Sequence, residues 1–273
     1  MSVAAPLRFR PLEDAVRRAL GAVRFVDANT GELLREPLDV TVVGARLRRN
    51  RSGLWVISDV AALQAHGAAF DAPPALPAPG SITLQLQVGD PSGRYLPRSA
   101  TLALPRDAAL ANAGLPGSLF RAIDLAMFPS PAAPTAANWA LLRVSVVEAA
   151  SGDALGGALL RVTRNGDTLA RALSDWRGEA LVPVPGVPVT TWSAGPGAVV
   201  VSEVAASLDV VFDAALGSRL PMAGVRAGTP PQQLPVVDPD DLNARRAALP
   251  GALRAVQLAA GRAASVFLPL ALP

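Results

Sequence analysis

The sequence contains no cysteine, no lysine, a single histidine and a single tyrosine among its 273 residues. The lack of cysteine excludes disulfides, thiol catalysis and cysteine-based zinc sites. One histidine, His66, is too few for a histidine-rich metal site or for most acid–base dyads. We therefore expect no catalytic residue, no metal site and no cofactor, and we do not expect an enzyme.

Because lysine is absent, all 25 basic residues are arginine, and the formal net charge is only +3. The isoelectric point of 10.7 would suggest a nucleic-acid-binding protein if it were read alone. However, without cysteine and lysine almost nothing titrates between roughly pH 7 and pH 12. The high value therefore reflects missing titratable groups rather than a dense basic surface, and we expect no nucleic-acid partner.

Long uninterrupted apolar segments are also missing, although the mean hydropathy is +0.33. The longest window without charge, residues 180–202, is broken by Pro183, Pro185, Pro188 and Pro196, so no continuous helix can form there. The N-terminus has no apolar stretch of the kind found in secretory signals. We expect no membrane span, and synthesis in the cytoplasm without a signal peptide.

Two stretches of the sequence are alike. Residues 23–43 read VRFVDANTGELLREPLDVTVV, and residues 144–163 read VSVVEAASGDALGGALLRVT. Each combines a β-branched run, an acidic residue, a Thr/Ser-Gly turn and a second apolar run. Arg-Asn at 49–50 and Ser-Asp at 58–59 are also matched by Arg-Asn at 164–165 and Ser-Asp at 174–175. Either one domain is present in two copies, or two generic hairpins are alike by chance.

Short strands at regular spacing dominate the second stretch. Asn165-Gly166 predicts a tight hairpin turn, and Pro185-Gly186 predicts another turn. In the first stretch, residues 81–88 (SITLQLQV) alternate strictly and predict a half-buried strand. We predict an all-β fold of two related β-sandwich domains of the immunoglobulin-like or transthyretin-like kind.

The second copy resembles the carboxypeptidase regulatory-like (transthyretin-like) sandwich family. The resemblance lies in VSVVE at 144–148, SGDALGGA at 151–158, SDWRGEALV at 174–182 and Pro185-Gly186. VPVTTW at 187–192 replaces the tyrosine-containing strand that is usual in this family. The resemblance implies a non-catalytic accessory or structural module.

The remaining segments complete the predicted organisation. We expect an N-terminal arm (1–20), a first sandwich (21–106), a linker (107–140), a second sandwich (141–215) and a partly helical C-terminal extension (216–273). Helical turns are expected at 119–127, from Asp238 to about Leu249, and at 253–264. We expect the apolar tail at 265–273 to be buried only in an assembly.

Two groups of side chains are candidates for partner binding. The first is an arginine cluster near one turn, made of Arg46, Arg48, Arg49 and Arg51. The simplest interpretation is a solvated hairpin tip. Because guanidinium groups suit recognition of carboxylates and phosphates, the alternatives are an acidic protein partner and, less favoured, a nucleic acid. The second is Trp176 with Arg177, because Trp176 lies in a turn and the other tryptophans lie in or beside apolar strands.

The absence of a signal sequence and of disulfides favours a particle assembled in the cytoplasm and then released. DPSGRYLPR (90–98) and SDWRGEALVPVPGVPVTTW (174–192) are similar to segments of small accessory proteins of phage-tail-like contractile injection systems. We therefore expect a structural subunit of a baseplate, a spike or an accessory part, with other protein subunits as partners and no small-molecule ligand. The alternative is a glycan- or receptor-binding sandwich with exposed tryptophans.

Overall fold

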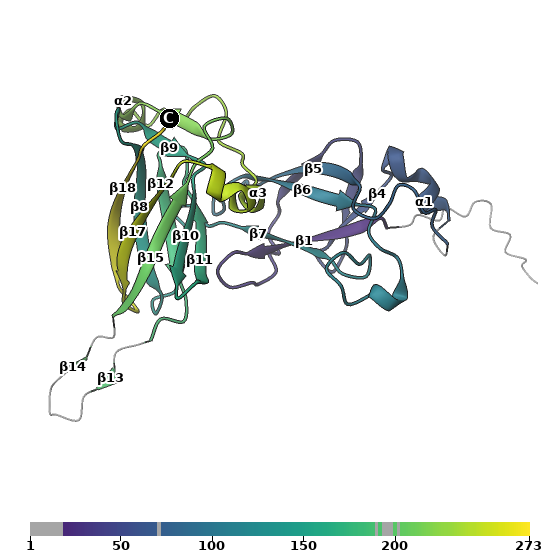
Figure 1. Ribbon diagram of the computed structural model, residues 1–273, viewed down its shortest axis with the longest axis horizontal. Helices are drawn as coiled ribbons and strands as arrows, with labels where there is room; N and C mark the ends of the chain where they lie inside the picture. Colours follow the sequence, from purple (N-terminus) through teal and green to yellow (C-terminus); the bar gives the residue numbers. More distant parts are fainter. Residues whose placement is uncertain (1–18, 70–71, 189–190, 193–198, 201–202) are drawn as a thin grey trace, which may run out of the picture.

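The computed structural model describes residues 19–69, 72–188, 191–192, 199–200 and 203–273. Two lobes lie side by side along the long axis of the molecule (Figure 1). The first lobe contains strands β1 to β7 and the second contains β8 to β18. Each lobe has its own hydrophobic core, and a smaller cluster around Phe128 lies between them. The all-β fold predicted from the sequence is confirmed.

Two sheets form the first lobe, in the orders β3-β4-β1-β7 and β2-β5-β6. Buried and exposed residues alternate in β5, as the sequence predicted, because only one face of this sheet contacts the core. The strands are β1 (Gly21–Asp27), β2 (Asp39–Val42), β3 (Arg46–Arg49), β4 (Trp55–Ser58), β5 (Ile82–Gly89), β6 (Arg98–Leu104) and β7 (Ile123–Met127).

The second lobe contains one sheet in the order β11-β10-β15-β17 and another in which β8 lies between β12 and β18. The hairpin predicted at Asn165-Gly166 joins β10 to β11, and both residues have positive φ angles. The strands are β8 (Ala140–Glu148), β9 (Ala154–Gly156), β10 (Leu159–Arg164), β11 (Asp167–Leu173), β12 (Glu179–Val184), β13 (Thr191–Trp192), β14 (Val199–Val200), β15 (Val204–Val211), β16 (Ser218–Leu220), β17 (Gly251–Leu258) and β18 (Ala263–Leu270).

Helices are few and short: α1 (Gln64–Ala68), α2 (Met222–Arg226) and α3 (Pro239–Arg245), with single 3-10 turns at Ala61–Leu63, Leu110–Asn112 and Arg246–Ala248. The helix predicted after Asp238 is confirmed as α3. The Asp238 side chain accepts hydrogen bonds from the amides of Asp240 and Asp241 and so caps the helix. In the described part of the chain, no helix has the length and hydropathy needed to cross a membrane.

Two other predicted helices are wrong. Residues 119–127 end in strand β7, whose side chains alternate between the core and the surface, and β7 runs parallel to β1. Residues 253–264 contribute to β17 and β18, where burial again alternates. In both segments a weak helical propensity from alanine and leucine is overridden by the sheet faces that these strands complete.

The predicted burial of the 265–273 tail only in an assembly is also wrong. Strand β18 pairs with β8 in the chain's own sheet, and Val266, Leu268 and Leu270 are buried in the core of the second lobe. Phe267 and Pro269 alternate with them and face outward. Strands β7, β17 and β18, which we expected outside the two sandwiches, therefore pair within them. The N-terminal arm, apart from residues 19–20, lies outside the described residues.

The internal repeat is present in three dimensions. In the turn at 27–32 the first amide donates to the last carbonyl at 2.9 Å, and in the turn at 148–153 the same bond measures 2.8 Å. Gly31 and Gly152 occupy the same place in the two turns, with φ angles of 71° and 75°. A backbone bridge between Val26 and Leu33 in the first lobe matches the pairing of Val147 with Ala154 in the second.

Strand pairing extends this equivalence over both lobes. β1 lies between antiparallel β4 and parallel β7, and β8 lies between antiparallel β12 and parallel β18. The ladder β2-β5-β6 has its counterpart in β10-β15-β17. The connection from β5 to β6 is short (90–97), whereas the connection from β15 to β17 is a long insertion (212–250) that includes α3.

One part of the predicted alignment is wrong. The turn that begins at Asn50 matches the turn that begins at Asp175, because each side chain accepts a hydrogen bond from the amide four residues later. Gly53 and Gly178 have positive φ angles at the same place in these turns. The sequence alignment paired 49–50 with 164–165 and 58–59 with 174–175 because the residues at these positions are identical. The hydrogen bonds of the two turns instead show that Asn50 corresponds to Asp175.

Candidate functional site

The two lobes meet at an ion-pair network centred on Arg98, at the start of β6. Its side chain is completely buried. The guanidinium donates to the carbonyl oxygen of Ala126 at 2.7 Å, to Asp238 at 3.4 Å and to Asp240 at 2.9 Å. Because a buried charge is costly without partners, these contacts hold the insertion of the second lobe against the first lobe.

Asp240 joins the two lobes through its two carboxylate oxygens. One accepts from Arg98 of the first lobe, and the other accepts from Arg171 of β11 at 3.0 Å. Partial burial alone would raise the pKa of Asp240, but the hydrogen bonds and charges of Arg98 and Arg171 outweigh this effect and lower it. The carboxylate is therefore ionised at neutral pH and is held between arginines of both lobes.

Helix α3 is fixed to the second lobe by further contacts. Leu242 is buried in the cluster between the lobes, and Asn243 accepts a hydrogen bond from Arg161 at 3.3 Å. Arg245 pairs with Asp213 at 2.8 Å and with Asp241 at 2.7 Å. Because α3 contacts both lobes, we infer that it fixes their relative orientation.

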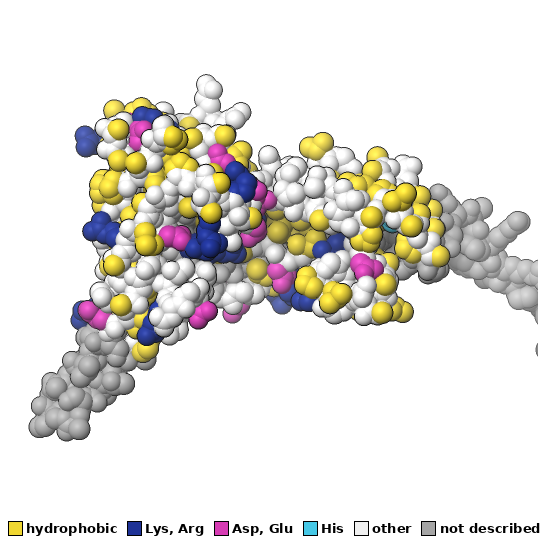
Figure 2. Space-filling view, viewed as in Figure 1, with side chains coloured by type: hydrophobic (Ala, Val, Ile, Leu, Met, Phe, Trp, Pro, Cys, Tyr) yellow, Lys and Arg dark blue, Asp and Glu magenta, His cyan; other side chains and the backbone are white. Residues whose placement is uncertain are grey.

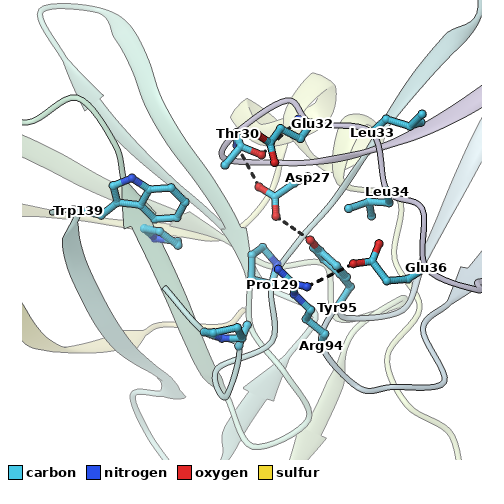
Figure 3. A pocket seen from close by; sticks show the side chains of 13 residues that line it. Asp27, Thr30, Glu32, Leu33, Leu34, Glu36, Arg94, Tyr95, Pro129 and Trp139 are labelled. Carbon is cyan, nitrogen blue, oxygen red and sulfur yellow. Dashed lines mark hydrogen bonds and ion pairs between the residues drawn. The ribbon is translucent and has the colours of Figure 1, made fainter. Parts of the chain in front are cut away.

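A cavity of about 140 Å³ lies between the lobes, and we name it the junction cavity (Figure 3). The 27–32 turn forms one wall. In that turn Asp27 accepts from the amides of Asn29 and Thr30 with one oxygen, and from the Tyr95 hydroxyl at 2.8 Å with the other. The lining residues are Asp27, Thr30, Glu32, Leu33, Leu34, Glu36, Arg94, Tyr95, Pro129, Ala133, Pro134, Trp139 and Pro183.

Tyr95 is held in this cavity by the β5–β6 loop. Asp90 accepts hydrogen bonds from Ser92 and from the Tyr95 amide, and these bonds outweigh its partial burial and lower the pKa of Asp90. Burial of the Tyr95 ring, and then its hydrogen bond to Asp27, raise the pKa of the phenol well above its ordinary value of 10.0. The phenol therefore stays protonated and donates to Asp27.

The opposite wall is aromatic and apolar. Trp139 is partly exposed and comes from the segment that precedes β8. On the first lobe's side of the cavity, Glu36 pairs with Arg94 at 3.3 Å, and the Arg94 guanidinium lies 5.6 Å from the centre of the Tyr95 ring. The cavity thus combines an aromatic surface with several hydrogen-bonding groups, and three carboxylates outnumber the single arginine.

The predicted arginine cluster does not form one clamp. Arg46 and Arg48 alternate with Leu47 on β3 and are exposed, and Arg46 lies 3.6 Å from Asp59. Arg49 instead donates to the carbonyl oxygen of Arg35 at 2.7 Å, so it holds the chain's own 35–36 segment. Arg51 lies in the following turn. It lines an open basic groove with Arg35 and Arg49.

Trp176 and Arg177 lie in the other lobe from this cluster. Arg177 bonds to Asp175 at 2.8 Å and pairs with Glu179 at 3.2 Å, as expected for ion pairing within the turn. Trp176 is partly buried and contributes to a small apolar pocket together with Pro235 and Val237 of the insertion. Both residues therefore make contacts within the chain.

The other tryptophans differ in their surroundings. Trp55 packs edge-on against Phe25 at 6.2 Å in the first lobe, which agrees with a core role. Trp139 lines the junction cavity, and the side chain of Trp192 lies outside the described residues.

Sequence reasoning missed Arg98, Tyr95 and Asp240 as a group, because nothing in their spacing indicates that the insertion folds back onto β6. The only available signal was the single tyrosine in DPSGRYLPR.

Among the described residues there is no group of three or more histidine, aspartate or glutamate side chains arranged to hold a metal ion. Comparison of the whole chain with models of known protein families and with curated proteins found no match.

Proposed function

We propose that the chain is a non-catalytic structural subunit of a larger protein assembly, and more specifically a baseplate, spike or accessory subunit of a phage-tail-like contractile particle. The observation that carries this proposal is the junction, where buried Arg98 and bridging Asp240 join the two lobes. Two domains in one chain usually move relative to one another unless their interface is extensive. A fixed junction suits a subunit that sets the spacing between its neighbours.

The experiment for this proposal is purification of the native complex through a tag on this chain, with co-migrating subunits identified by mass spectrometry. We expect tail-tube or sheath proteins to migrate with it. A chain that runs alone, or a complex without tube and sheath proteins, contradicts the contractile-particle proposal.

A matched pair of variants tests the role of the fixed junction. Asp240→Asn removes the carboxylate shared by Arg98 and Arg171, whereas Asp241→Asn removes the neighbouring carboxylate, whose ion-pair partner among the described residues is exposed Arg245. We expect Asp240→Asn to reduce incorporation into the complex and Asp241→Asn to leave it unchanged. Equal incorporation of the two variants would contradict a requirement for a fixed junction.

Arg46, Arg48 and Arg51 stay as predicted partner contacts within this proposal, because their side chains are exposed on β3 and the following turn. Arg49 is a weaker candidate, since it holds residues 35–36 of its own chain. We expect Arg48→Glu to weaken an acidic neighbour's binding more than Arg49→Ala does. This difference is measured by the amount of each variant recovered in the native complex.

A second candidate function is glycan binding, which is favoured by the junction cavity. Stacking of a sugar ring on Trp139, with hydrogen bonds to Glu32 or Glu36, is chemically reasonable for a cavity of this lining. We expect binding to a glycan array that Trp139→Ala abolishes and Trp176→Phe, outside this cavity, preserves. The glycan proposal fails if the wild-type protein binds no glycan, or if Trp139→Ala binds as well as the wild type.

A further inference from the structure

Strands β17 and β18 lie at adjacent edges of the two sheets of the second lobe, and no other described strand pairs with the outer edge of either (Figure 1). The Phe212 amide donates to the Pro250 carbonyl, and in an antiparallel pair every second residue bonds to the neighbouring strand. The even-numbered residues of β17 therefore bond to β15. The N–H and C=O groups of Leu253, Ala255 and Gln257 point away from β15. In β18, Ser265 and Phe267 likewise point their backbone groups away from β8. We name these two edges the β17–β18 seam.

In the first lobe the equivalent seam, between β6 and β7, is covered by the chain's own insertion. The amide of Ser99 donates to the Val237 carbonyl at 2.8 Å, and the amide of Thr101 donates to the Asp238 carboxylate at 2.9 Å. Arg98 pairs with Asp238 and Asp240 of the same segment. The covered seam thus binds an extended stretch that supplies the Val237 carbonyl and the Asp238 carboxylate, followed by the first turn of α3, which supplies the Asp240 carboxylate.

Each seam contains an arginine that bridges its two strands. Arg98 of β6 donates to the Ala126 carbonyl of β7 at 2.7 Å, and Arg254 of β17 donates to the Phe267 carbonyl of β18 at 2.8 Å. The two arginines differ in whether they also pair with carboxylates. Arg98 is fully buried beneath two carboxylates, whereas Arg254 is exposed and forms no ion pair with any described residue.

The surroundings of the open seam are apolar and cationic. Leu253 and Phe267 are 72% and 57% exposed, and among the described residues they are the exposed large hydrophobic side chains that lie on strands. Arg143 on β8 and Arg262 in the β17–β18 turn are exposed, and neither pairs with a carboxylate in the part of the chain described. In Figure 2, hydrophobic and arginine side chains lie along the margin of the second lobe, where Figure 1 places these strands.

Carboxylates near the seam do not neutralise this charge. Asp209 is opposite Leu253 in the strand register, but it pairs with Arg161 at 2.5 Å on the other side. Glu148 is opposite Leu270 and pairs with Arg219. Within the described part of the chain, the seam therefore has backbone donors without a partner, a positive charge without a paired carboxylate, and two exposed apolar side chains.

We propose that the β17–β18 seam binds an extended acidic segment of a partner protein, in the way that the β6–β7 seam binds residues 235–238. The segment adds to the free edge of β17, its carbonyls accept from the amides of Leu253 and Ala255, and a carboxylate pairs with Arg254. Its apolar side chains on the outer face of that sheet cover Leu253. This inference rests on the proposed function, since the partner is another subunit of the assembly.

The test uses the full chain and a synthetic peptide with the sequence of residues 233–242 (QLPVVDPDDL), which is the segment that the first seam binds. A second peptide has asparagine at the three aspartate positions. The covalently attached segment keeps the first seam occupied, because its effective concentration exceeds that of the added peptide. Binding is measured by fluorescence anisotropy for the wild type, for Arg254→Glu, and for Arg164→Glu, which makes the same charge change at an exposed arginine on β10, a strand that β15 separates from β17.

We expect the acidic peptide to bind the wild type and Arg164→Glu alike, and Arg254→Glu to bind it about tenfold or more weakly. We expect the asparagine peptide to bind weakly to all three proteins. The inference is overturned if the acidic peptide does not bind, if both peptides bind equally, or if the two variants behave alike. It is also overturned, in favour of a second copy of this chain, if the wild type is a dimer that Arg254→Glu dissociates.

The native complex separates this inference from the proposed function. If Arg254→Glu is recovered in the complex as fully as the wild type, the seam proposal fails and the structural function stands. If the peptide binds at the seam but the chain is found in no complex, the structural function fails and the seam stands as a binding site.

Discussion

Substitution of Asp240 by asparagine tests the junction between the lobes most sharply. The change keeps the size of the side chain but removes the charge that pairs with Arg98 at 2.9 Å and with Arg171 at 3.0 Å. A hydrogen bond to a charged group contributes about 1.5–3 kcal/mol, and a partly exposed ion pair adds about 0–1 kcal/mol. We expect the free energy of unfolding to fall by about 2–3 kcal/mol.

Asp241→Asn is the matched control, because Asp241 lies in the same first turn of α3 and has a similar interaction with the helix dipole. Its partner Arg245 is 42% exposed and keeps a second carboxylate, Asp213. An exposed pair of this spacing contributes only about 0.3–0.5 kcal/mol. Urea unfolding at neutral pH, together with hydrogen exchange of the Ser99 and Thr101 amides at the junction, distinguishes the two variants.

The effect of Asp240 also depends on pH in a defined direction. Its pKa is lowered in the folded protein, so its stabilisation is complete above the unfolded-state pKa of roughly 4 and is lost as the pH falls through the lower folded-state value. The difference between the wild type and Asp240→Asn should therefore shrink in acid. The reasoning is refuted if the two asparagine variants lose equal stability at neutral pH, or if the Asp240→Asn loss is unchanged at low pH.

Three further predictions concern the lobes themselves. Gly178→Ala should destabilise the second lobe more than Gly166→Ala in urea unfolding. Both glycines have positive φ angles, but only at Gly178 would the new methyl group overlap the Val146 carbonyl oxygen. Equal losses of stability in the two variants would contradict this. The single tyrosine, Tyr95, should not ionise near its ordinary pKa in the folded protein, and a tyrosinate absorbance that appears near pH 10 without unfolding would count against its burial and its bond to Asp27. Leu86→Ala and Leu208→Ala, at matching strands of the two cores, should each cost about 2–5 kcal/mol in calorimetry or urea unfolding, and a negligible loss at either site would argue against two separate packed cores.

Local sequence patterns predicted the all-β fold and several of its turns. The alternation at 81–88 and the Asn165-Gly166 turn are local signals, so β5 and the β10–β11 hairpin followed from them directly. The cap at Asp238 was equally local, because one carboxylate and two nearby amides determine it. The likeness of residues 23–43 and 144–163 indicated the repeat, and the matching hydrogen bonds of the two turns support it.

Long-range pairing explains what the sequence did not predict. Strand β18 contacts β8 more than 100 residues away, so the 265–273 tail looked unpaired when it was read alone. The junction depends on residues 98 and 240, which no periodicity connects. In the predicted arginine site, closeness in the sequence was mistaken for closeness in space. The four arginines are neighbours in the sequence, but their side chains point in different directions on β3 and the following turn.

Photo-crosslinking in the native complex tests the central claim most directly. A photoreactive residue placed at Leu253, in the open β17–β18 seam, should form a crosslink to an acidic segment of a different subunit, identified by mass spectrometry. The same residue placed at Leu216, exposed on the β15–β17 insertion, is the control for nonspecific capture. Crosslinks from position 253 only within this chain, or none beyond those of the control, would contradict an assembly subunit that docks through this seam.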